Sequence, residues 1–63
     1  MTQKELAYVE DAIGHESSII KICEDAIKNL DNDDFINYMQ SEISNHQNIK
    51  NELMALLKEK ANG

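Results

Sequence analysis

Apolar residues recur every three or four positions along both halves of this 63-residue chain. This is the spacing of a helix face that packs against other helices. The pattern predicts an all-α fold with two helices, each presenting one long stripe to a neighbour. In the first half the stripe consists of Leu6, Val9, Ile13, Glu16, Ile20, Cys23, Ile27 and Leu30. In the second half it consists of Phe35, Met39, Glu42, His46, Ile49, Leu53 and Leu56.

The start of the first helix is marked by Thr2 and Glu5, which have the spacing of a capping box. In this motif the Thr hydroxyl accepts a hydrogen bond from a backbone N–H of the first turn, and the Glu carboxylate bonds back to the Thr N–H. We therefore expect a helix over residues 3–29. Asn29 is expected to end it in a left-handed conformation, which Asn adopts more readily than most residues.

The only interruption of the helical pattern is a short turn at residues 30–32. Asp31 or Asn32 can cap a second helix, and the acidic residues that follow suit its positive end. The second helix is expected over residues 33–60. A turn this short returns the second helix antiparallel beside the first, so the chain is predicted to form one helical hairpin.

More apolar residues are present than one partner helix can cover, because further Ala, Ile and Leu residues flank both stripes. Two hairpins related by a two-fold axis would bury them in a four-helix bundle. The alternative is that the flanking residues stay half exposed on a monomer. The residues expected at an interface between two copies are Ala12, Ile13, Ile19, Ile20, Ala26, Ile36, Ile43, Ile49 and Leu57.

Three ionisable residues interrupt the stripes: Glu16 in the first and Glu42 and His46 in the second. Carboxylates and imidazoles inside a helical bundle are the ligands of di-iron and di-manganese sites, so these residues are candidate metal ligands. The alternative is a polar layer that fixes the register or the oligomeric state. Matching the stripes about the turn places Glu16 level with Ile49 and leaning away from His46, so a metal site would need ligands from a second chain.

Composition narrows the classes of function. Six Lys and no Arg oppose twelve Asp and Glu, and the net charge of −6 argues against nucleic acid and against an anionic membrane surface as partners. No apolar run has the length of a bilayer span. A single cysteine cannot form an internal disulfide, which is typical of a reducing compartment, so we expect a cytoplasmic protein.

The segment from Met39 to Leu53, with Glu42 and His46 one helical turn apart, resembles the metal-bearing helix of ferritin-like and rubrerythrin-like proteins. It is similar as well to the half-length helical proteins grouped with the spore coat F proteins. The resemblance implies a half-bundle completed by dimerisation and a connection with sporulation. It matches Glu16 to the first-helix carboxylate and His46 to the second-helix imidazole. The matching carboxylate of the second helix would stand at position 43, which is Ile here.

From these patterns we expect a non-enzymatic helical hairpin that self-associates and acts as a structural or protein-interaction module. No complete catalytic motif and no cofactor motif occurs in the sequence. The expected partner is a second copy of the chain, with a larger helical protein as a further option. The alternative function is a ferritin-like protein that binds a divalent metal through Glu16, Glu42 and His46 across a homodimer.

Overall fold

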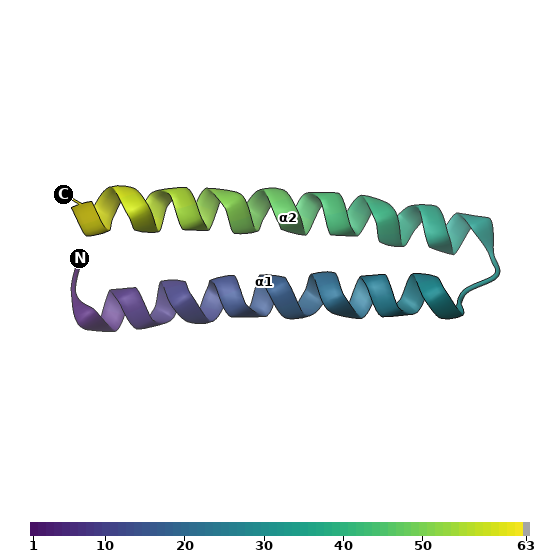
Figure 1. Ribbon diagram of the computed structural model, residues 1–63, viewed down its shortest axis with the longest axis horizontal. Helices are drawn as coiled ribbons and strands as arrows, with labels where there is room; N and C mark the ends of the chain where they lie inside the picture. The colour runs from purple at the N-terminus through teal and green to yellow at the C-terminus, as the bar shows by residue number, and fades with distance from the viewer. Residues whose placement is uncertain (63) are drawn as a thin grey trace.

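The computed structural model describes residues 1–62 and shows two long antiparallel helices joined by a short turn (Figure 1). Helix α1 spans Gln3–Asn29 and helix α2 spans Asp33–Asn62. The described part of the chain contains no strand, which confirms the expected all-α fold. The hairpin is thin and elongated, about 47 × 15 × 11 Å, with both chain ends at the end opposite the turn.

Helix α1 begins as the sequence predicts. The Thr2 hydroxyl accepts a hydrogen bond from the Glu5 N–H at 3.0 Å, and the Glu5 carboxylate accepts from the Thr2 N–H at 2.9 Å. Its end does not use the left-handed conformation that Asn29 could adopt, because no residue of the described chain has a positive φ and Asn29 is helical. The helix stops at Leu30, which is extended (φ −102°, ψ 138°) and half-buried. Turning this apolar side chain inward ends the helix without a left-handed residue.

Helix α2 begins at the cap that Asn32 provides. Its side-chain oxygen accepts hydrogen bonds from the backbone N–H groups of Asp34 (2.9 Å) and Phe35 (3.2 Å), which have no partner within the helix. Asp33 and Asp34 occupy the first turn, where negative charge is favourable. The helix continues to Asn62, two residues beyond the expected end.

The packing seam between the helices uses the predicted stripe of α1, every member of which is half-buried or buried. Cys23, at 7% exposure, is the one buried residue among the described side chains. The seam of α2, however, is rotated by one position from the prediction. Phe35, Ile49 and Leu56 are exposed, and the half-buried residues at heptad spacing are Ile36, Met39, Ile43, His46, Lys50, Leu53 and Leu57.

The predicted seam and the observed seam of α2 share Met39, His46 and Leu53, so the sequence pattern alone hardly distinguishes between them. In the observed structure Glu42 is half-buried beside the seam, and its carboxylate lies 3.2 Å from His46 Nε2. The observed seam also contains Lys50, whose apolar stem can lie along the seam while its ammonium group reaches water. The two seams therefore differ mainly in which large apolar residues face α1: Ile36, Ile43 and Leu57 in the structure, instead of Phe35, Ile49 and Leu56.

Within residues 1–62, neither helix combines the length and the apolar content that crossing a membrane requires.

Candidate functional site

The three ionisable residues of the stripes form one polar cluster at the middle of the hairpin. Glu16 projects from α1, and Glu42 and His46 project from α2 one turn apart. His46 Nδ1 is hydrogen-bonded to Glu16 Oε2, and His46 Nε2 lies 3.2 Å from Glu42 Oε2. The side chains are partly buried, with exposures of 16% for Glu16, 21% for His46 and 29% for Glu42.

The prediction that Glu16 leans away from His46 is therefore wrong. It followed from a register that placed Glu16 level with Ile49. The rotated seam of α2 moves the register by about one helical turn, and Glu16 then lies level with His46. Seven-residue steps from this layer place Cys23 opposite Met39 and Val9 opposite Leu53. Between these layers and the cluster lie Ile20 with Ile43 on the turn side and Ile13 with Lys50 on the other side.

The cluster favours the protonated form of His46. A carboxylate can only accept hydrogen bonds, so an imidazole ring with a carboxylate at each nitrogen is best satisfied when both nitrogens carry a proton. The hydrogen bond to Glu16 is the largest cause that raises the pKa of His46 above 6.5, with Glu42 adding to it, and partial burial opposes the rise. In this form, a positively charged His46 lies between the carboxylates of Glu16 and Glu42.

The polar cluster of a single hairpin is not arranged to bind a metal ion. The donor types are suitable, because carboxylates and imidazoles bind divalent metals. The arrangement is not, because both ring nitrogens of His46 already face carboxylate oxygens. Among residues 1–62, no three His, Cys, Asp or Glu side chains are grouped so that they could hold a metal ion. A metal would have to displace the Glu16–His46 bond or take ligands from another chain.

The residues expected at an interface between copies separate into two groups. Five lie in the seam between α1 and α2 and are already half-buried within one chain: Ile13, Ile20, Ile36, Ile43 and Leu57. Ala12, Ile19 and Ala26 flank the seam of α1 and are half-buried, and Ile49 flanks the seam of α2 and is 41% exposed. Both groups keep exposed surface in the single chain, and the second group lies further from the contact between the two helices.

These flanking residues belong to a larger surface, which we call the apolar face. On each helix it occupies the positions directly before the seam residues and one turn away from them. Its apolar members are Tyr8, Ala12, Ile19, Ile22 and Ala26 on α1, and Phe35, Tyr38, Ile49 and Leu56 on α2. Polar residues occupy the remaining positions of this face: Glu5, His15, Asn29, Glu42, Asn45 and Glu52. Sequence reasoning did not include Tyr8, Ile22 or Tyr38 in the interface, and it placed Phe35 and Leu56 in the contact between the two helices. For Tyr8 and Ile22, the signal that could have found them is a second series of apolar residues beside the first stripe, from Tyr8 to Ala26, which His15 interrupts.

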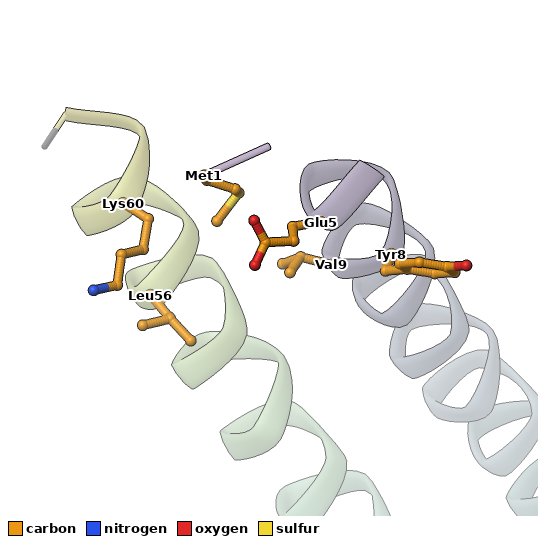
Figure 2. Close-up of a pocket in the computed structure, with 6 residues that line it drawn as sticks. All are labelled: Met1, Glu5, Tyr8, Val9, Leu56 and Lys60. Atoms are coloured by element: carbon orange, nitrogen blue, oxygen red, sulfur yellow. The ribbon is translucent and has the colours of Figure 1, made fainter. Parts of the chain in front are cut away.

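The two halves of the apolar face lie on the same side of the hairpin. In antiparallel packing, the positions that precede the seam flank the same side of both helices, because a two-fold axis perpendicular to the helices relates them. At the free end, Tyr8 and Val9 of α1 and Leu56 of α2 line one open groove, together with Met1, Glu5 and Lys60 (Figure 2). Among the described residues, the opposite side is mostly polar, with Ala7, Gly14 and Met54 as its non-polar positions: Glu10, Ser17, Glu24, Gln40 and Gln47 occupy corresponding positions.

Comparisons of this chain with protein families, with curated proteins and with solved structures gave no match.

Proposed function

We propose that this protein is a self-associating helical hairpin that acts as a structural or protein-interaction module, with a four-helix bundle of two chains as its working form. The observation that carries the proposal is the excess of exposed surface. The hairpin exposes 4900 Å². A compact folded monomer of 7.2 kDa exposes about 4,100 Å² by the usual scaling of surface with mass.

The excess of about 800 Å² per chain equals the area that each partner contributes to a standard protein interface. The apolar face provides the side chains for such an interface. Phe35 is 59% exposed and Ile22 is 66% exposed, although both are large apolar residues. Exposed large apolar side chains grouped on one side of a domain are typical of interaction sites. A second hairpin placed on this face would bury it and complete the bundle.

The test is sedimentation equilibrium combined with circular dichroism over a range of protein concentrations. We expect a mass of twice the chain mass and a thermal midpoint that rises with concentration, because association stabilises the folded state. A monomer of one chain mass that unfolds cooperatively at a concentration-independent midpoint would refute the proposal.

We propose a divalent metal centre shared by two hairpins as the second candidate function. The observation that favours it is the meeting of Glu16, Glu42 and His46 in one cluster at the middle of the molecule. Two such clusters facing each other in a dimer would bring together four carboxylates and two imidazoles, a donor set suited to two metal ions.

Thermal unfolding with and without added Mn²⁺, Fe²⁺ or Zn²⁺ tests this candidate, because a ligand that binds only the folded state raises the midpoint. His46→Gln should remove the rise, whereas His15→Gln, at an exposed position outside the cluster, should keep it. No rise at saturating metal would eliminate the metal centre.

A further inference from the structure

The hollows at the two ends of the apolar face are formed by different elements. At the turn end, Phe35 and Tyr38 are exposed beside a shallow hollow that they line with Asp34 and Met39, all residues of α2. At the free end, the open groove of Figure 2 runs between α1 and α2 over Val9 and Leu56, and the exposed Tyr8 stands at its edge. Both ends therefore offer an exposed aromatic ring and a hollow, but only the hollow at the free end lies between the two helices.

The charges at the two ends differ as well. The turn end carries three exposed aspartates, Asp31, Asp33 and Asp34, close to a single lysine, Lys28. The free end carries three exposed lysines, and its acidic neighbours in the chain are Glu5 and Glu59. The lysines are Lys4, Lys58 and Lys60. The turn end is thus the negative pole of the hairpin and the free end is the less negative one.

From the charge difference, and from the groove between the helices at the free end, we infer that the second copy docks on the apolar face in the antiparallel sense, so that the turn of each hairpin covers the free end of the other. Phe35 of each chain enters the groove at the partner's free end. This inference rests on the proposed self-association and adds its surface and orientation. The acidic turn of one copy then lies beside the lysines of the other, where opposite charges attract.

The polar cluster lies about midway between Phe35 and Leu56 along the hairpin, so a two-fold axis through the cluster can pair these two residues. Phe35 is eleven residues from His46 toward the turn, and Leu56 is ten residues from it toward the free end. At a rise of ~1.5 Å per residue, these offsets are about 16 and 15 Å. A two-fold axis through the cluster layer, perpendicular to the helices, therefore brings Phe35 of one chain over Leu56 of the other.

The other symmetric arrangement has its two-fold axis along the helices and places the two turns together. It sets three aspartates of one chain against three of the other at one end and lysines against lysines at the opposite end. Like charges in close contact oppose association. Each chain already has a net charge of −6, so the arrangement that spreads these charges apart is favoured.

Substitution of the projecting ring tests the surface. Phe35→Ala should weaken the dimer at least ~10-fold in sedimentation equilibrium, because the aromatic ring that fills the partner's groove is lost. Met54→Ala is the matched control, since Met54 is 48% exposed but stands on the opposite, polar side. Circular dichroism of both variants verifies that each hairpin is folded. An unchanged dissociation constant for Phe35→Ala would refute the docking surface.

Spin labels at the turn test the orientation. In a Cys23→Ala background, Asp31→Cys carries one label per chain, and the hairpin is 47 Å long. We expect a label-to-label distance close to that length, about 40 Å or more, since antiparallel docking separates the turns by the length of a helix pair. A dimer with the labels within about 25 Å would overturn this inference and leave the proposed self-association intact. A monomer at all concentrations would overturn both.

Discussion

Replacing Lys50 with isoleucine tests the rotated seam of α2. Lys50 is half-buried in that seam and interrupts the apolar series from Ile43 to Leu57. Burying an Ile side chain completely contributes about 1.5–3 kcal/mol relative to leaving it exposed. The position is half-buried, and the Lys stem can already cover part of the contact, so we expect Lys50→Ile to stabilise folding by about 1 kcal/mol. For a domain of this size, that raises the thermal midpoint by about 4–8 °C.

The matched control is Lys58→Ile, at an exposed position of the same helix. Both substitutions remove one positive charge and exchange a good helix former for a β-branched residue, so their difference isolates the effect of burial. Thermal and urea unfolding by circular dichroism, at equal protein concentration, measure both variants. If Lys50→Ile were no more stable than Lys58→Ile, Lys50 would lie outside the seam, and a seam through Phe35 and Ile49 would have to replace it.

Three further predictions concern the polar cluster and the helix ends. The stabilisation from protonated His46 is fully present below the unfolded pKa of about 6.5 and is lost as pH rises through its raised folded pKa, so the thermal midpoint should fall over that window. His46→Gln should abolish this part of the pH dependence and the exposed His15→Gln should retain it; equal pH profiles would contradict the assignment. Gly14→Ala should stabilise α1 by about 1 kcal/mol in urea unfolding, because the position is exposed and an added Cβ would meet no atom within 4 Å. Asn32→Ala should destabilise the hairpin by about 1 kcal/mol through the loss of the α2 cap, whereas Asp31→Ala should not; equal losses in urea unfolding would mean that the cap is unimportant.

The sequence predicted the helices because their signals are local. The capping box of Thr2 and Glu5 and the Asn32 cap depend on residues within three positions of each other, and the structure shows both. The end of α1 was predicted less well. Asn29 was expected to turn left-handed, but the helix ends through the burial of Leu30, which depends on contacts with the rest of the hairpin.

The candidate site was predicted only as a set of residues. That Glu16, Glu42 and His46 break the stripes is visible in the sequence. Whether they meet depends on the register between the helices. A shift of one helix by one turn relative to the other decides whether Glu16 and His46 are in contact. The same shift decides whether Phe35 and Leu56 belong to the core of one hairpin or to the surface that it offers to another.

The amino-acid sequence by itself therefore determined two helices, their starts and the seam residues of α1, because caps and a single clear heptad stripe act within one helix. Only the tertiary structure decided which of two overlapping stripes of α2 faces α1. Those stripes share Met39, His46 and Leu53 and differ in whether Phe35, Ile49 and Leu56 or Ile36, Ile43 and Leu57 face α1. That choice depends on how the side chains of both helices fill the space between them, which neither helix determines alone, and it places the polar cluster and the apolar face.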